Sequence, residues 1–325
     1  MRRGQGSADT SYAGRMIVRA ALLGLAGGQA VKDAVTSAPG IGDIVTRFAA
    51  GESDDDALRA TSDLQDEGFD VTLDYLGEDT LDRVQAEQTA GAYVRILSRL
   101  ADAGLAPRTE VSVKLSAVGQ ALPGEGAELA TDNALAICEA AKDAGTTVTL
   151  DMEDHTTTDL TLASLAALRK DFPDTGAVLQ SYLHRTEADC RDLAASGSRI
   201  RLCKGAYREP ESVAFQSRAD IDRSYVRCMK VLLAGEGYPM FATHDDRLIS
   251  IAEALTRRYG RGPDTYEFQM LYGVRRDEQR RLLGAGEAIR VYVPYGTEWY
   301  GYLVRRMAER PANLSLGLRA ILDRQ

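Results

Sequence analysis

The chain has 325 residues, of which 44% are apolar, and it carries a net charge of −9 with a pI near 5.1. This length accommodates either two domains or one large α/β barrel. The acidic balance, with no basic run interleaved with aromatic residues, argues against a nucleic-acid partner.

Residues 1–67 contain two or three short helical patterns with few apolar residues. So few apolar side chains could hardly bury a core alone, so we interpret 1–67 as a helical lead-in or cap and 68–325 as the barrel domain. The basic pair Arg2-Arg3 and the apolar run 20–30 superficially resemble an export signal. That run is interrupted or bounded by basic residues and is too short to span a membrane, which favours lead-in helices in a cytoplasmic protein.

From about residue 68 the chain alternates short β-rich runs with longer helical patterns. The predicted strands are 70–75, 110–115, 146–151, 177–182, 198–203, 239–243, 265–270 and 288–294. The predicted helices are 79–103, 127–144, 158–171, 185–196, 212–235, 246–259, 275–285 and 298–310. Eight strand–helix units favour an α/β fold in which a parallel sheet closes into a distorted (βα)8 TIM barrel. An open doubly wound sheet is the alternative.

Capping residues indicate where several of these helices begin and end. Glu78-Asp79, Asp132-Asn133 and Asp245-Asp246 are of the type found at helix starts. Gly104 and Gly145 follow two helical patterns and are typical helix terminators.

The cysteines and histidines show no pattern of a metal or disulfide site. Cysteines 138, 190, 203 and 228 form no Cys-x-x-Cys pair, and histidines 155, 184 and 244 are far apart in the sequence. We therefore expect free thiols in a reducing cytosol and no metal site.

Polar residues end six consecutive predicted strands, at the barrel face where barrel enzymes build their active sites. They include Lys114, Asp151, Gln180, Arg201 with Lys204, Thr243 with His244, and Gln269. One such residue could serve an ion pair alone, but six strands ending this way predict a functional site.

The last strand–helix unit, 288–310, is the most informative part of the chain. The strand pattern stops at Pro294-Tyr-Gly296, and one face of the following helical pattern carries Tyr302, Arg305, Arg306 and Glu309. Two adjacent guanidinium groups, flanked by aromatic rings and held by a carboxylate, make a clamp for a small anion.

This run resembles the carboxy-terminal signature of the proline dehydrogenases, flavin enzymes that oxidise L-proline. Further segments match the family in order over about residues 70–315, namely 112–117, 150–153, Gln180, 201–207, 241–244 and 266–273. The resemblance implies that Arg305, Arg306 and Lys114 bind the proline carboxylate and that Glu309 orients the arginines. It also implies that Tyr292, Tyr302 and Leu271 enclose the ring.

The resemblance implies FAD as the cofactor, with Asp151 beside substrate and flavin and Arg201 near the reactive flavin nitrogen. The residues that it assigns to FAD binding are Met152, Gln180, Arg201, Lys204, Gly205, Ala206, Tyr207, Arg208, Thr243 and His244. Arg208 stands where bifunctional relatives carry a tryptophan, and Tyr272 where they carry a histidine. These departures indicate a short monofunctional enzyme and leave the flavin contacts near residue 208 open.

The implied reaction removes a hydride from the ring carbon next to nitrogen and yields 1-pyrroline-5-carboxylate. The pairs Gly124-Glu-Gly126 and Gly284-Ala-Gly286 lack the third glycine of a dinucleotide-binding turn, so we expect electrons to pass to a quinone rather than to a nicotinamide. A separate pyrroline-5-carboxylate dehydrogenase would act downstream. Reaching a membrane quinone would require peripheral contact at the inner face of the membrane, or a partner.

Two other functions compete with this interpretation. One is a Schiff-base aldolase that uses Lys114 or Lys204 as the reactive lysine. The other is an amino-acid binding module that binds proline without oxidising it.

Overall fold

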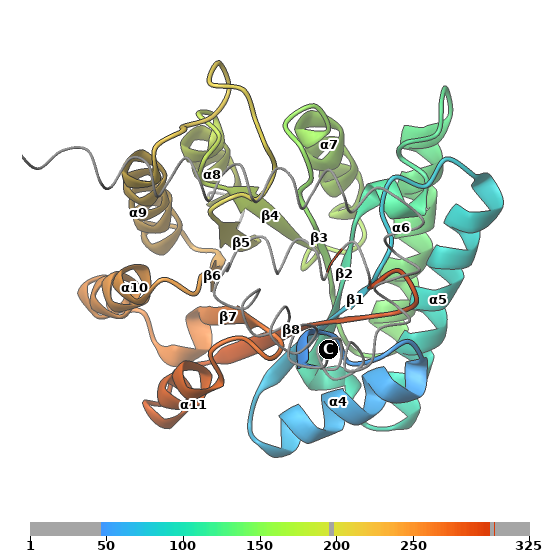
Figure 1. Ribbon diagram of the computed structural model, residues 1–325, viewed down its shortest axis with the longest axis horizontal. Coiled ribbons are helices and arrows are strands. Elements are labelled where there is room, and N and C mark those ends of the chain that lie inside the picture. The colour runs from blue at the N-terminus through green and yellow to red at the C-terminus, as the bar shows by residue number, and fades with distance from the viewer. Residues whose placement is uncertain (1–46, 195–197, 300–301, 303–325) are drawn as a thin grey trace, which may run out of the picture.

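Eight parallel strands form a closed barrel in the computed structural model, which describes residues 47–194, 198–299 and 302 (Figure 1). The strands are β1 (Asp70–Tyr75), β2 (Thr109–Val113), β3 (Val148–Leu150), β4 (Gly176–Gln180), β5 (Arg199–Cys203), β6 (Tyr238–Ala242), β7 (Glu267–Leu271) and β8 (Ile289–Tyr295). Each strand pairs with the next in the chain, and β8 closes onto β1. The predicted (βα)8 barrel is confirmed, and the doubly wound alternative is wrong.

The barrel is distorted because the pairing between neighbouring strands differs in length around it. Six residue pairs join β1 to β8, whereas only two, Thr149 with Gly176 and Leu150 with Ala177, join β3 to β4. The sheet therefore has its shortest strand pairing between β3, the shortest strand, and β4.

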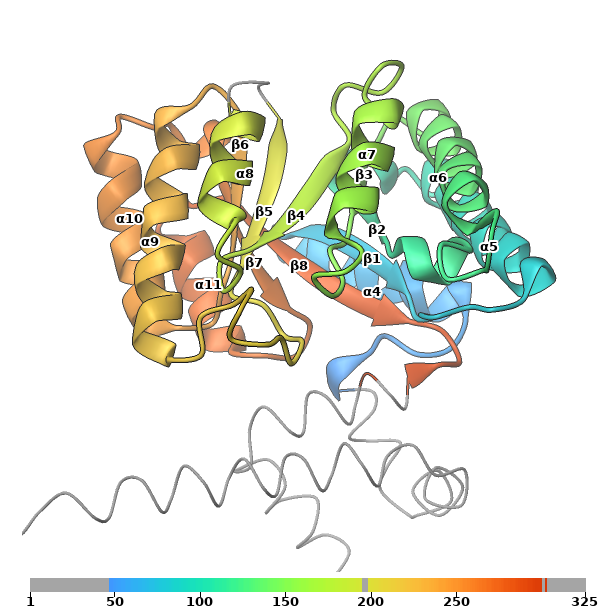
Figure 2. The same cartoon turned by 90° about the horizontal axis from the view of Figure 1, so that it is seen from above.

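Helices follow the strands and surround the barrel (Figures 1 and 2). They are α5 (Arg83–Asp102), α6 (Gly126–Asp143), α7 (Thr158–Leu168), α8 (Thr186–Ala194), α9 (Arg218–Ala234), α10 (Asp246–Arg258) and α11 (Arg276–Gly284). Short 3₁₀ turns lie at Ala106–Arg108, Leu115–Val118 and Pro263–Thr265. The predicted helix over 298–310 falls almost entirely outside the described residues.

Side-chain caps account for where several of these helices begin. Asp245 caps α10 as predicted, but α5 begins behind Asp82 rather than at Glu78-Asp79. The prediction that Asp132-Asn133 starts a helix is wrong, because the pair lies inside α6. Helix α9 begins behind Ser217, six residues later than predicted. Gly104 and Gly145 follow α5 and α6 in the left-handed conformation, which confirms both predicted helix ends.

A further helix, α4 (Asp54–Asp66), lies between α11 and α5 in the ring of helices (Figure 1). Ser53 and Asp56 form a capping box at its start, and Ala57, Ala60 and Leu64 belong to the core of the barrel. Ion pairs tie it to both neighbours, since Asp54 binds Arg95 of α5 at 2.7 Å and Glu67, next to its end, binds Arg280 of α11 at 3.1 Å. The division of the chain at residue 67 stays a prediction.

The hydrophobic core lies between the strands and the helices. Strand residues such as Val71, Val111 and Val291 are fully buried there beside Ile96 and Ile137 of the helices. The alternate strand residues are polar, and side chains of β2 bond to side chains of β5 across the barrel. Because successive strand residues point to opposite faces, the barrel interior holds charged and polar groups instead of the usual branched apolar ones.

Candidate active site

A cavity of about 540 Å³ opens among the carboxyl ends of the strands, a size typical of small-molecule sites. Its lining includes most of the residues predicted from the sequence, namely Lys114, Asp151, Met152, Gln180, Arg201, Lys204, Gly205, Ala206, Tyr207, Thr243, His244, Leu271, Tyr292 and Tyr302. Arg208 is exposed and is not part of this lining. Arg305, Arg306 and Glu309 lie outside the described residues, so the anion clamp stays a prediction.

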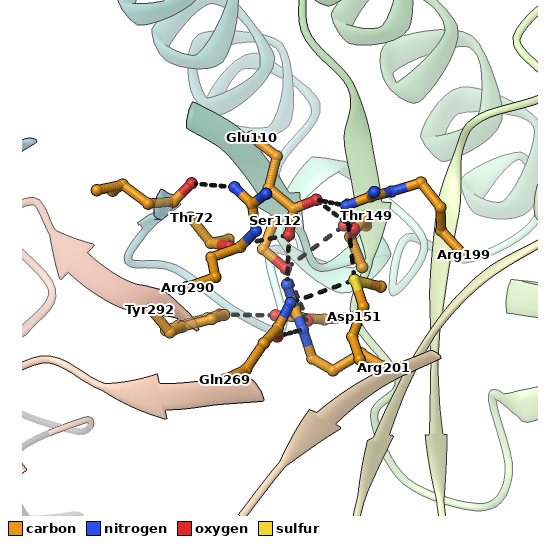
Figure 3. Close-up of polar contacts among 12 residues, drawn as sticks. Thr72, Glu110, Ser112, Thr149, Asp151, Arg199, Arg201, Gln269, Arg290 and Tyr292 are labelled. Carbon is orange, nitrogen blue, oxygen red and sulfur yellow. Dashed lines mark hydrogen bonds and ion pairs between the residues drawn. The ribbon is translucent and has the colours of Figure 1, made fainter. Parts of the chain in front are cut away.

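Arg201, on β5, has hydrogen-bond partners on β2 and β7 and directly after β3, inside the barrel (Figure 3). Its Nε donates to Gln269 at 2.5 Å, one terminal nitrogen donates to Ser112 at 2.8 Å and Asp151 at 2.7 Å, and the other donates to Glu110 at 2.9 Å. Burial alone would lower the pKa of this guanidinium, but the carboxylates of Asp151 and Glu110 outweigh it and raise the pKa. Arg201 is thus a charged group fixed in one orientation.

Asp151 follows β3 and connects this arginine to the cavity. Its Oδ1 accepts from Ser112 at 2.7 Å and from Arg201, while its Oδ2 accepts from the Tyr292 hydroxyl at 2.7 Å. The guanidinium carbon of Arg201 also lies 5.2 Å from the centroid of the Tyr292 ring, within cation–π range. Burial, followed by the charge of Asp151, raises the pKa of Tyr292, so this tyrosine is a neutral hydroxyl donor.

Lys114 is held by an acidic residue that the sequence did not single out. Its ammonium group contacts both carboxylate oxygens of Asp74 at 2.9 Å and lies 3.9 Å from Asp151. Burial would lower the pKa of Lys114, but the two carboxylates outweigh it and raise the pKa. The lysine is therefore a permanent cation whose charge is balanced by Asp74 in this arrangement.

Gln180 presents a buried acceptor at the end of β4. Its Nε2 donates to the main-chain carbonyls of Met152 at 3.0 Å and Glu153 at 3.1 Å, which determines the orientation of the amide. Its Oε1 is buried and has no hydrogen-bond partner among the described residues. A buried acceptor of this kind is suited to an N–H donor of a bound ring.

Basic side chains gather on the β5–β6 side of the cavity. Lys204 binds Asp222 at 2.5 Å and Asp245 at 3.0 Å, and Arg218 binds Asp245 at 2.8 Å. Lys204 and Arg218 both line the cavity, so cationic donors are available there for the phosphates of a nucleotide cofactor.

The loop after β5 is anchored by Glu209, a buried carboxylate. It accepts from the main-chain N–H of His155 at 2.9 Å and from the Tyr182 hydroxyl at 3.2 Å, and it also contacts the His155 ring. The loop that carries Lys204–Tyr207 is thereby tied to the segment that carries Asp151 and Met152.

Sequence reasoning missed several residues of this site. Asp74, Glu78, Arg218 and Asp245 line the cavity, and Glu110 binds Arg201 behind it. A usable signal existed in the strands, because polar and charged residues recur there at alternate positions, as in Thr72–Asp74 and Glu110–Ser112–Lys114.

The described residues contain no group of three or more His, Cys, Asp or Glu side chains that could hold a metal ion. Within the same part of the chain, no helix combines the length and the apolar character needed to cross a bilayer.

Comparison with known proteins agrees with the barrel and the resemblance. A family model described as Proline dehydrogenase matches residues 57–317. Proline dehydrogenase of Deinococcus radiodurans is 40% identical over 281 residues, which cover 86% of this chain and 90% of that protein. Proline dehydrogenase 1 of Bacillus subtilis is 36% identical over 278 residues, with the same two coverages of 86% and 90%.

A solved structure shares the fold. The crystal structure of proline utilization A (PutA) from Bdellovibrio bacteriovorus inactivated by N-propargylglycine superposes with a TM-score of 0.76 at 26% identity. The match covers 82% of this chain and 32% of that much longer one. Because the family model spans all eight strands of the barrel and two relatives match over nearly their whole length, the chain belongs to the proline dehydrogenase family.

Proposed function

We propose that this protein oxidises L-proline to 1-pyrroline-5-carboxylate with FAD as its cofactor and passes the electrons to a quinone. The observation that carries the proposal is the arrangement of Lys114, Asp151, Arg201 and Tyr292 around one cavity in a chain of this family. Arg201 and Tyr292 lie on β5 and β8, Lys114 and Asp151 directly follow β2 and β3, and each of the four is fixed by hydrogen bonds or ion pairs.

The residues of the cavity fit FAD. The buried Oε1 of Gln180 offers an acceptor to the N–H edge of a flavin ring, and Lys204 and Arg218 offer cations to its diphosphate. Met152, Gly205, Ala206, Tyr207, Thr243 and His244 complete the proposed binding surface, with Arg208 beside it. When bound, FAD would supply the oxidant that accepts a hydride.

The protein groups would bind and orient the substrate. We propose that Lys114, together with Arg305 and Arg306, binds the proline carboxylate and that Glu309 orients the arginines. Tyr292, Tyr302 and Leu271 would enclose the ring and exclude water. Fixing the reacting carbon in this way contributes on the order of 7–11 kcal/mol in favourable cases.

Lys114 is poorly suited to the Schiff-base chemistry of an aldolase. That chemistry needs a neutral amine, which a lysine reaches when its pKa is lowered by burial or by a nearby cation. Here the pKa of Lys114 is raised by Asp74 and Asp151, against the effect of burial. The ion pair thus favours anion binding over nucleophilic attack.

We also propose that the protein is cytoplasmic and reaches its quinone by peripheral contact at the inner face of the membrane. A separate pyrroline-5-carboxylate dehydrogenase would consume the product.

The visible spectrum tests the function directly. We expect purified protein, supplemented with FAD if needed, to be yellow and to lose its flavin absorbance when L-proline is added without oxygen. Reoxidation by a soluble quinone should restore the colour, with pyrroline-5-carboxylate accumulating. Binding of proline without bleaching would support the binding module instead. Steady proline-dependent reduction of NAD by this chain alone would contradict the proposed acceptor.

A substitution at Gly205 tests the cofactor-binding loop. Gly205 has a φ of 109°, and an added methyl group would collide with the Tyr182 ring. Gly205→Ala should therefore shift the loop and weaken FAD binding by about ten- to a hundredfold, as expected for strain of roughly 1–3 kcal/mol. FAD titration of the apoprotein measures this.

Gly145→Ala provides the matched control. Gly145 also has a positive φ, 76°, but nothing lies within 4 Å of the added methyl group, and the residue is outside the cavity lining. This variant should lose some stability and keep its affinity for FAD. Equal affinities in folded Gly205→Ala and in the unmodified protein would show that the loop does not depend on this glycine.

A further inference from the structure

We propose that Glu110, a residue outside the cavity, positions Arg201 for the reaction and balances part of its charge. The inference rests on the proposed function and extends it to a second layer of side chains inside the barrel. Glu110 and Asp151 bind different terminal nitrogens of Arg201 (Figure 3).

Each oxygen of Glu110 has its own pair of partners. Oε1 accepts from Arg201 at 2.9 Å and from Thr72 at 2.8 Å. Oε2 accepts from Arg199 at 3.0 Å and from Thr149 at 3.1 Å. The carboxylate is 1% exposed, so its position is set by these four donors and not by water.

The arginines around Glu110 keep it ionised well below neutral pH. Burial by itself would raise its pKa, but Arg290, Arg199 and Arg201 outweigh that effect and lower the pKa to about 2. A permanent anion therefore stands behind Arg201.

Stability alone does not require these buried charges. Apolar groups of similar volume often replace a buried ion pair without loss, because removing charges from water costs several kcal/mol per ion. The charged groups inside the barrel are better explained by their effect on the position and charge of Arg201 and Asp151, which line the cavity.

The effect concerns how Asp151 is shared. Asp151 binds Arg201 at 2.7 Å and Tyr292 at 2.7 Å, and Lys114 lies 3.9 Å away. With Glu110 as a second counter-charge, Arg201 does not depend on Asp151 alone, and Oδ2 of Asp151 keeps its contacts with Tyr292 and Lys114. Without the negative charge of Glu110, Arg201 would be attracted more strongly to Asp151. That attraction would compete with the contacts that Asp151 makes with Tyr292 and Lys114.

Glu110→Gln tests the proposal, with Glu267→Gln as the matched control. Glu267 is also a buried interior carboxylate, but its arginine partner is Arg290 at 2.9 Å. It reaches Arg201 only through Gln269, which donates to Glu267 and accepts from Arg201, and a glutamine at position 267 keeps an oxygen that can accept that bond. Both variants should lose comparable thermal stability. Only Glu110→Gln should lower kcat for proline, by about tenfold or more, with KM changed less than about threefold.

The reduction potential of the bound flavin provides a readout that stability would not move. Because the family resemblance implies that Arg201 lies near the reactive flavin nitrogen, neutralising Glu110 should favour the reduced flavin. We expect a shift of about tenfold in the redox equilibrium, equal to about 30 mV for a two-electron couple. Glu267→Gln should shift it much less.

A second pair of variants covers the case in which Glu110→Gln does not fold. Thr72→Val removes a hydrogen bond from the oxygen that holds Arg201, and Thr149→Val removes one from the other oxygen. Only Thr72→Val should lower kcat, by about threefold or more.

The outcomes separate this inference from the proposed function. If the unmodified protein takes up no FAD or does not oxidise proline, the proposed function is wrong. The second outcome is that the protein oxidises proline while a test variant and its control, Glu110→Gln with Glu267→Gln or Thr72→Val with Thr149→Val, both fold and have equal kcat and equal flavin reduction potential. In that case Glu110 is only structural and the inference is overturned.

Discussion

Arg201→Met should abolish measurable proline oxidation and lower the free energy of unfolding by about 3–5 kcal/mol, the usual cost of breaking a buried ion pair. The substitution removes four hydrogen bonds and leaves Glu110 and Asp151 without their shared cation. Anaerobic flavin bleaching by proline measures the activity, and urea unfolding measures the stability.

Arg199→Met is the control for this prediction. Arg199 binds the same carboxylate, Glu110, at 3.0 Å, but its side chain is 19% exposed and it does not line the cavity. It should lose less stability and retain proline oxidation within about tenfold of the unmodified protein. Equal loss of activity in the two variants would mean that charge anywhere in the barrel matters and that Arg201 has no special position.

Lys114→Met should lower kcat/KM for proline by about a hundredfold or more, since loss of one partner of a buried charge pair costs about 2–5 kcal/mol. It removes a cation that is proposed to bind the substrate carboxylate. It also leaves Asp74, whose side chain is 2% exposed, without its bidentate partner, so stability should fall as well. Steady-state kinetics with a soluble quinone and thermal unfolding measure the two effects.

The double variant Lys114→Met/Asp74→Asn separates these effects. It removes the unpaired buried carboxylate and should therefore recover most of the lost stability without recovering kcat/KM. Lys170→Met, at an exposed lysine that does not line the cavity, should change neither quantity. If the double variant regained activity, Lys114 would serve stability only.

The strands of this barrel could be predicted because their signal is local. Val71, Leu73, Val111 and Val113 alternate with polar residues, and such a pattern depends on nothing beyond a few neighbours in the chain. The same holds for Gly104 and Gly145, where a left-handed residue ends a helix. Helix starts were predicted less well where tertiary contacts intervene. Helix α9 starts late because the first residues of the predicted helix pair with another segment: the His184 N–H bonds to the Val213 carbonyl, and the Phe215 N–H bonds to the Tyr182 carbonyl.

The sequence alone thus determined the barrel class, the family resemblance and most of the residues at the carboxyl ends of the strands. Only the tertiary structure decided which charges meet. In the sequence, Glu110 and Arg201 are 91 residues apart, and each looks like an ordinary charge on an alternating strand. They are partners because the sheet closes and brings the inner faces of β2 and β5 together. The physical reason is that periodicity depends on adjacent residues, whereas a buried ion pair depends on the distance between atoms across the barrel.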